Sequence, residues 1–136
     1  MAERDTLGLL DDIDSTLPAL TRCLQISARA AGAGFEWDSV EDVWDQVASE
    51  RAEFAAEERG SAAAAEEFGD ILFALVNVAR WEGIDAEAAL AASNAKFCRR
   101  WSEMERLAQE RGQRLKELST VEQNVLWREV KAEEHS

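Results

Sequence analysis

Two pairs of acidic residues have a spacing that can build a metal site, Glu50 with Glu53 and Glu67 with Asp70. Residues three apart share one face of an α-helix, so each pair forms a short carboxylate ladder. If the two helices that carry the pairs pack side by side, four carboxylates converge, and they repel one another unless a hard cation binds between them. Mg²⁺ prefers carboxylate and water oxygens, and Mn²⁺ accepts the same donors. The pattern therefore predicts a divalent-metal site of the kind that holds a polyphosphate.

The surroundings of these two pairs distinguish them from the other acidic pairs of the chain. Other pairs three apart arise by chance among the 28 acidic residues, namely Asp11/Asp14, Asp42/Asp45 and Glu82/Asp85. Glu50, however, interrupts the apolar stripe of its helix, and Glu67 and Asp70 lead directly into residues 71–79, which are apolar almost all round. For any single pair, a solvated helix face remains the alternative interpretation.

Two polar features near the acidic pairs are candidates for substrate contact. Asn77 follows Asp70 by two helical turns, and its amide needs a partner because burying it unpaired costs about 1–3 kcal/mol. Trp37, in the link before the first acidic helix, can stack on a base or belong to the core. The sequence alone leaves both interpretations of Trp37 open.

A basic segment, residues 94–100, supplies cations in a chain that is otherwise short of them. Lys96 and Arg100 are four residues apart on one predicted helix face and can clamp the outer phosphates of a nucleotide. The alternative is a surface ladder of ion pairs, since Arg99 and Glu103 are also four apart. The two interpretations carry equal weight on sequence grounds.

The elements that must position these residues are predicted to be helices throughout. The chain is rich in Ala, Glu, Leu and Arg, contains one proline, and has its glycines at the borders of periodic segments. The pattern predicts five helices. The first runs from Ser15 or Thr16 to about residue 31, the second follows a Ser39 N-cap, and the third covers about 62–81. The fourth runs from an Asp85 cap to about 111, and the last covers about 120–132 and opens with a Thr120/Gln123 capping box. The third of these is expected to be the buried central helix.

The length predicts one domain, residues 1–136, with a leader over 1–14, a core over about 15–111 and the C-terminal helix. A net charge of −13 argues against nucleic-acid and anionic-membrane partners. No apolar run is long enough to span a bilayer, and the N-terminus lacks the features of a signal peptide. Cys23 and Cys98 are expected to be free thiols. We therefore expect a cytoplasmic protein. His135, near the C-terminus, is the only histidine, which excludes His-dependent triads and ferritin-like di-iron sites.

Several motifs, in order over about residues 15–130, resemble those of one enzyme family. They are Leu17-Pro18-Ala19-Leu20, Gly34-Phe35-Glu36-Trp37, Glu50-Arg51-Ala52-Glu53, Glu66-Glu67-Phe68-Gly69-Asp70-Ile71-Leu72-Phe73, Asn77-Val78-Ala79-Arg80 and Asn94-Ala95-Lys96-Phe97-Cys98-Arg99-Arg100. The chain resembles the all-α nucleoside triphosphate pyrophosphohydrolases of the MazG type, specifically the second, C-terminal repeat of full-length members. The run through Gly69-Asp70 into the apolar helix and the Asn-x-Lys-Phe-x-Arg-Arg segment are the most specific parts.

The resemblance implies an all-α, four-helix-type bundle and Mg²⁺-dependent cleavage between the α- and β-phosphates, which yields a nucleoside monophosphate and pyrophosphate and removes unwanted nucleotides from the pool. It implies a homodimer or a dimer of dimers. The metal ligands, which are also the catalytic residues, would be Glu50, Glu53, Glu67 and Asp70. The substrate-binding residues would be Asn77, Lys96, Arg99, Arg100, Trp37 and Asn94.

The chain departs from the family pattern at the first acidic motif. The family has Glu-Glu-x-x-Glu there, and this chain has Ser49 in place of the first Glu; Gln46 likewise replaces a common lysine. That first Glu often helps to activate the attacking water or to hold a further metal. The alternative function is therefore a catalytically weakened or inactive nucleotide-binding or interaction module of the same fold.

Overall fold

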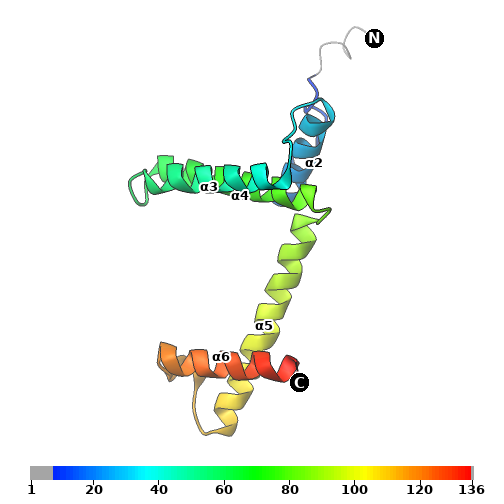
Figure 1. The fold of residues 1–136 in the computed structure, drawn as a ribbon. Coiled ribbons are helices and arrows are strands. Elements are labelled where there is room, and N and C mark those ends of the chain that lie inside the picture. The colour runs from blue at the N-terminus through cyan, green and yellow to red at the C-terminus, as the bar shows by residue number, and fades with distance from the viewer. Residues whose placement is uncertain (1–7, 136) are drawn as a thin grey trace. The chain divides into compact units, whose positions relative to one another are not determined.

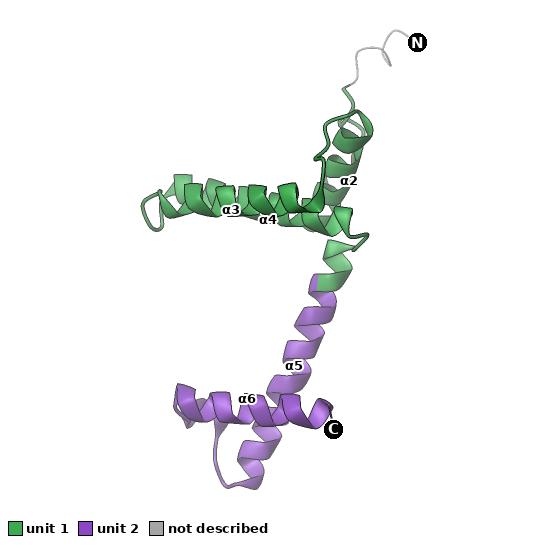
Figure 2. Cartoon of the chain, viewed as in Figure 1, with its two compact units in different colours: residues 1–89 green, residues 90–136 purple. Residues whose placement is uncertain are grey.

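The computed structural model describes residues 8–135, and all regular structure in that range is helical, so the predicted all-α class is confirmed. The chain divides into two compact units, residues 1–89 and 90–136, which are described separately below (Figure 2). The prediction of a single domain over residues 1–136 stays a prediction, and residues 1–7 of the predicted leader lie outside the described range. None of the helices described is long and apolar enough to cross a membrane.

The first unit is built around α4, Ala62–Trp81, which packs against both α3, Val40–Ala55, and α2, Ala19–Gly32. Figure 1 shows α3 and α4 lying side by side, joined by a short loop. Val43 of α3 is fully buried, and Ala74, Val76 and Val78 of α4 are also buried. These small side chains allow the helices to approach closely.

Serine caps define where α3 and α4 begin. The hydroxyl of Ser39 accepts the backbone N–H of Asp42 at 3.2 Å, and that of Ser61 accepts the N–H of Ala64 at 3.1 Å. Each cap satisfies a helix-start N–H that has no partner within the helix. Gly60, in the loop between the two helices, has a φ of 76°, a conformation that a side chain would strain. The predicted Ser39 cap and the predicted bounds of α4 are confirmed.

The predicted start of the first helix is wrong by about three residues. Helix α2 begins at Ala19 with Pro18 as its N-cap, not at Ser15 or Thr16. The Asp14 carboxylate accepts the N–H of Thr16 at 2.8 Å and its hydroxyl at 2.6 Å, which holds this segment in a turn. The residue before a proline also avoids the helical region, so Leu17 cannot readily extend the helix.

The expectation that α4 is buried all round does not hold within this chain. Phe68, Leu72 and Leu75 are 49%, 43% and 38% exposed, and Phe73 is also exposed. The first three follow the i, i+4, i+7 spacing and therefore form one continuous stripe along the helix. Helices α2 and α3 cover only part of the α4 surface, which leaves this stripe partly exposed among residues 8–135.

The second unit contains most of α5, Ala86–Glu110, a short 3-10 helix, Leu115–Glu117, and α6, Thr120–Glu134. Its core consists of buried side chains from all three elements, namely Met104, Leu107, Ala108, Leu115, Leu126 and Val130. Two ion pairs join the long helices, Arg100 with Glu134 and Arg111 with Glu129, each at 2.8 Å.

The capping box of α6 lies one residue before its predicted place. The hydroxyl of Ser119, not that of Thr120, accepts the N–H of Glu122 at 3.2 Å, and the Glu122 carboxylate accepts the N–H of Ser119 at 3.1 Å. Both registers match the capping-box pattern. The charged Glu122 is a stronger acceptor than Gln123, which favours the observed register.

An ion pair anchors the link between α2 and α3 to the C-terminal end of α4. The two terminal nitrogens of Arg80 donate to the two carboxylate oxygens of Glu36, each at 2.7 Å, and the indole N–H of Trp81 donates to the same carboxylate at 3.1 Å. The hydrogen bonds from Arg80 lower the pKa of Glu36 from 4.5 to about 2, with help from the backbone N–H of Trp37. A planar guanidinium that binds a carboxylate through two bonds gives the link a defined position.

We predict that Glu36→Gln destabilises the protein by about 1 kcal/mol at pH 7, a modest value because the Glu36 side chain is 33% exposed and solvent screens the ion pair. A carboxyl group with a lowered pKa stabilises the fold above its unfolded pKa and loses that contribution as the pH falls toward its folded pKa. The difference in unfolding free energy between wild type and variant should therefore shrink between pH 4.5 and about 2.

The measurement is urea unfolding at a series of pH values, with Glu58→Gln as the control because Glu58 is exposed in the α3–α4 loop. A difference that stays constant down to pH 2 would contradict the assignment of the stabilisation to the Glu36 carboxylate.

Candidate functional site

Three of the four predicted metal ligands converge where α3 packs against α4. Each of Glu50, Glu67 and Asp70 offers a carboxylate oxygen, and these oxygens all lie within 4.8 Å of one another. The convergence follows from the pairing of the helices, because Glu67 and Asp70 share one face of α4 and Glu50 lies on the side of α3 that meets it. Mg²⁺ is commonly held by one or two carboxylates together with water or phosphate oxygens, so three convergent carboxylates can hold such a cation.

Two of these carboxylate oxygens are buried and have no hydrogen-bond partner, Glu50 Oε2 and Glu67 Oε2. Within residues 8–135, no salt bridge joins Glu50, Glu67 or Asp70 to a basic side chain. A buried anion without a partner is costly, and a bound cation removes that cost. The donor set, all carboxylate oxygens, fits Mg²⁺ or Mn²⁺.

The environment of Glu50 also favours a cation. Burial raises the pKa of Glu50, and the nearby carboxylates of Glu53 and Asp70 raise it further. The amide of Gln46, which donates to Glu50 Oε1 at 2.6 Å, acts in the opposite direction. Glu53, the fourth predicted ligand, thus contacts Glu50 but lies outside the three-residue cluster, on an exposed part of α3.

A cavity of about 290 Å³ adjoins the acidic cluster. Its lining combines carboxylates, aromatic rings and amides, namely Ser27, Ala30, Phe35, Trp37, Gln46, Glu50, Asp70, Phe73, Ala74 and Asn77. Two of the predicted substrate-binding residues, Trp37 and Asn77, therefore line the same cavity as two of the predicted metal ligands. A mostly apolar cavity with a few convergent polar groups is typical of a small-molecule site.

Asn77 has the hydrogen-bond partner that the sequence analysis required for it. The hydroxyl of Ser27, on α2, donates to Asn77 Oδ1, and Arg80 Nε donates to the Ser27 oxygen at 2.8 Å. Ser27 is only 4% exposed. Sequence analysis missed Ser27 and Arg80; a polar residue among the apolar positions of an amphipathic helix was the only available signal for Ser27.

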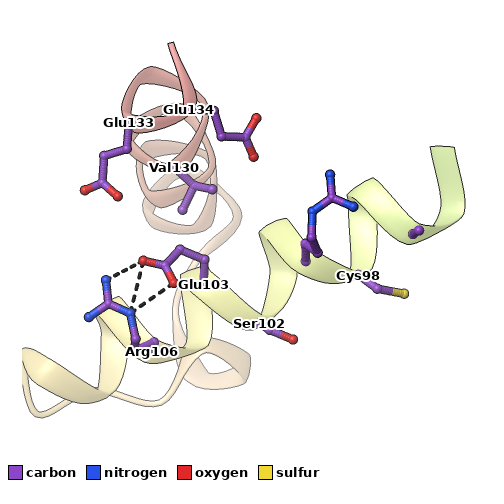
Figure 3. A pocket seen from close by; sticks show the side chains of 9 residues that line it. Cys98, Ser102, Glu103, Arg106, Val130, Glu133 and Glu134 are labelled. Carbon is purple, nitrogen blue, oxygen red and sulfur yellow. Dashed lines mark hydrogen bonds and ion pairs between the residues drawn. The ribbon is translucent and has the colours of Figure 1, made fainter. Parts of the chain in front are cut away.

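The predicted substrate-binding residues Asn94, Lys96, Arg99 and Arg100 belong to the part of α5 that lies in the second unit, whereas the acidic cluster belongs to the first unit. Arg100 forms its ion pair with Glu134, and its guanidinium lies 5.3 Å from the centre of the Trp127 ring. Arg99 lines a surface pocket between α5 and α6 (Figure 3).

The ion pairs in this surface pocket differ from the predicted ladder. Glu103 pairs with Arg106 rather than with Arg99 (Figure 3). Arg106 also binds Glu110, one turn further along α5. The i, i+3 and i, i+4 spacing of these residues on one helix face explains the pairing.

Comparison with known proteins identifies curated relatives over most of the chain, although no family model matches it. A nucleoside triphosphate pyrophosphohydrolase of Escherichia coli K12 is 41% identical over 98% of the chain and 52% of its own length. The nucleoside triphosphate pyrophosphohydrolase/pyrophosphatase MazG of Thermotoga maritima is 33% identical over 90% of the chain and 48% of its own length. An uncharacterised protein of Bacillus subtilis, YabN, is 52% identical over half of the chain and 14% of its own length.

The chain thus spans about half the length of the two pyrophosphohydrolases it matches. Over most of its length the chain is therefore similar to about half of a MazG-type nucleoside triphosphate pyrophosphohydrolase, in agreement with the resemblance seen in its motifs.

Proposed function

We propose that this protein is a Mg²⁺-dependent nucleoside triphosphate pyrophosphohydrolase that converts (d)NTPs to (d)NMPs and pyrophosphate and so removes unwanted nucleotides from the cytoplasmic pool. The observation that carries the proposal is the acidic cluster, with its two buried carboxylate oxygens that lack partners. The names of the relatives support the class of reaction.

Glu50, Glu67 and Asp70 would hold the metal, with Glu53 available from the next turn of α3. When bound, Mg²⁺ neutralises phosphate charge, polarises phosphorus and lowers the pKa of coordinated water. The protein's own contribution is to keep the carboxylates close together and to exclude water from the buried oxygens of Glu50 and Glu67.

The cavity beside the cluster is the proposed nucleotide site. Trp37, Phe35 and Phe73 line it with aromatic surface on which a base can stack, and Asn77 contributes a polar group. Following the family motif, we assign Lys96 and Arg100 to the phosphates and regard Arg99 and Asn94 as further substrate contacts. The net charge of −13 makes a nucleic acid an improbable substrate, whereas a nucleotide can enter as its metal complex.

We also propose that the protein is a homodimer or a dimer of dimers. The stripe of Phe68, Leu72 and Leu75 on α4 supports this, because it leaves three large apolar side chains uncovered within the described chain. Phe54 of α3, also exposed, extends the stripe through an edge contact with Phe68 at 5.7 Å between ring centres. A second copy packed on this surface would cover these side chains.

Ser49 supports the alternative function, a catalytically weakened or inactive module. The side chain lies on α3 directly before Glu50 and is exposed. It provides no carboxylate where the family motif has one, so the metal site could remain while hydrolysis is slow.

The primary test is pyrophosphate release from a panel of NTPs and dNTPs, with Mg²⁺, Mn²⁺ or EDTA, for wild type and Asp70→Asn. We predict release that requires the metal and yields the monophosphate. Asp70→Asn should reduce turnover by on the order of a hundredfold or more, about 3 kcal/mol of transition-state stabilisation. Its melting temperature without metal should be equal to or above that of wild type, because one repelling charge is gone, and its stabilisation by Mg²⁺ should shrink.

The matched control for this variant is Asp45→Asn, an exposed residue of the same helix as Glu50. Full activity in Asp70→Asn, or metal-independent release by wild type, would rule out the proposed metal site.

A second variant distinguishes the enzyme from the weakened module. If the protein is an active enzyme, Ser49→Glu should change turnover by less than about tenfold, since the existing carboxylates already carry the chemistry. Ala48→Glu, an exposed neighbour, controls for the added charge. A gain of a hundredfold or more that is specific to Ser49→Glu would favour the weakened module.

A third variant tests the dimer. Sedimentation velocity at micromolar concentration should show a dimer or larger oligomer for wild type, and Leu72→Glu should weaken association by at least about a hundredfold because both copies lose apolar contact and bury a charge. Val121→Glu introduces the same charge at a 71% exposed position of α6 and should leave the assembly intact. A monomeric wild type would contradict the proposal.

A further inference from the structure

The orientation of the Asn77 amide determines what the cavity can recognise. An asparagine side chain carries an acceptor oxygen and a donor NH₂ group, and rotation by 180° exchanges them. The side chain lines the cavity shared with Glu50 and Asp70. A donor facing this cavity selects ligand oxygens, whereas an acceptor would select N–H or O–H groups.

The hydrogen bonds behind Asn77 have only one possible direction. Arg80 has donors and no acceptor, so its Nε–H must donate to the Ser27 oxygen, at 2.8 Å. The hydroxyl hydrogen of Ser27 is then left to donate onward, and it meets Asn77 Oδ1. A terminal nitrogen of Arg80 also lies 3.5 Å from the same Oδ1. The contact with Arg80 requires the oxygen of the amide, not its nitrogen, on this side, because an NH₂ group there would face another donor; the Ser27 hydroxyl then donates to the same oxygen.

Arg80 is itself held in place. Its two terminal nitrogens bind the carboxylate of Glu36, and its side chain is only 16% exposed. Ser27 is buried and comes from a different helix, α2. Three segments of the chain, the link before α3, helix α2 and the end of α4, therefore determine the orientation of one amide group.

We propose that Arg80 and Ser27 are positioning residues that hold the Asn77 oxygen away from the cavity, so that the Asn77 NH₂ group recognises an acceptor oxygen of the nucleotide bound beside Glu50 and Asp70. This inference rests on the proposed function for the identity of the ligand. The oxygen can belong to a base carbonyl or to the sugar and phosphates, and the test below separates these sources.

The test is a double-mutant cycle on the kinetics of the full chain with Ser27→Ala, Asn77→Ala and both together. Each single variant should raise KM about tenfold, the worth of one hydrogen bond, with kcat changed less than about twofold, because the contact is present in both the bound and transition states. Ser27→Ala should add less than about twofold in the Asn77→Ala background, since it acts only through that amide.

Ser15→Ala is the matched control, because Ser15 is exposed in the turn before α2. If the two single effects multiply in the double variant, or if Ser27→Ala leaves KM unchanged, the relay is wrong while the proposed function stands. If Ser27 had only a structural role, Ser27→Ala would lower the stability of the protein, and its effect on KM would be the same with and without Asn77→Ala.

Substrate comparison identifies the oxygen that is recognised. If Asn77 reads a base carbonyl, Asn77→Ala should raise KM for dTTP and leave KM for dATP, whose base has no carbonyl, nearly unchanged. If it reads the sugar or phosphates, both substrates should suffer equally. An effect on dATP alone would contradict an acceptor oxygen as the ligand.

A measurement without nucleotide separates the relay from the proposed function. In ¹⁵N NMR spectra, the side-chain NH₂ of Asn77, assigned from its loss in Asn77→Ala, should be as ordered as the backbone in wild type and mobile in Ser27→Ala. If wild type hydrolyses no nucleotide but this difference is seen, the function fails and the relay stands. If the amide is equally mobile in both proteins, the relay is overturned.

Discussion

The packing of α3 against α4 is the constraint on which the rest of the first unit depends. Small residues in the shared core let the two helices lie close together, and Val43 becomes fully buried between them. The same approach forces Glu50, Glu67 and Asp70 together. The apolar contacts thus offset the electrostatic repulsion of the acidic cluster, which a bound cation would relieve.

The second determinant is the guanidinium of Arg80, which joins parts of the chain that are far apart in sequence. It binds Glu36 in the link before α3 and Ser27 in α2 from its own position in α4. Two sides of the cavity, the aromatic link with Phe35 and Trp37 and the amide of Asn77, therefore depend on one side chain. Arginine suits this role better than lysine because its planar fork supplies several donors in defined directions.

The stripe on α4 remains partly exposed, and the relatives are longer than this chain. Both observations indicate that α4 needs further cover. The chain corresponds to about half of the two curated pyrophosphohydrolases. A helix as apolar as α4 needs cover on more sides than α2 and α3 provide, and Phe68, Leu72 and Leu75 remain exposed. The proposed second copy of this chain would supply such cover.

Much of the local structure was determined by the sequence itself. Helical periodicity and capping depend on residues three or four apart, which is why the all-α class, the Ser39 cap, the bounds of α4 and the two acidic ladders were predictable. The errors at Pro18 and Ser119 are shifts between neighbouring local alternatives of similar energy. Only the tertiary structure decided which residues meet across the chain. The partners of Asn77 and Glu36 lie 50 and 44 residues away, Ser27 and Arg80 respectively, and no local pattern encodes such contacts. Likewise, three acidic ligands converge and the fourth does not because convergence depends on how two helices pack, not on spacing along either one.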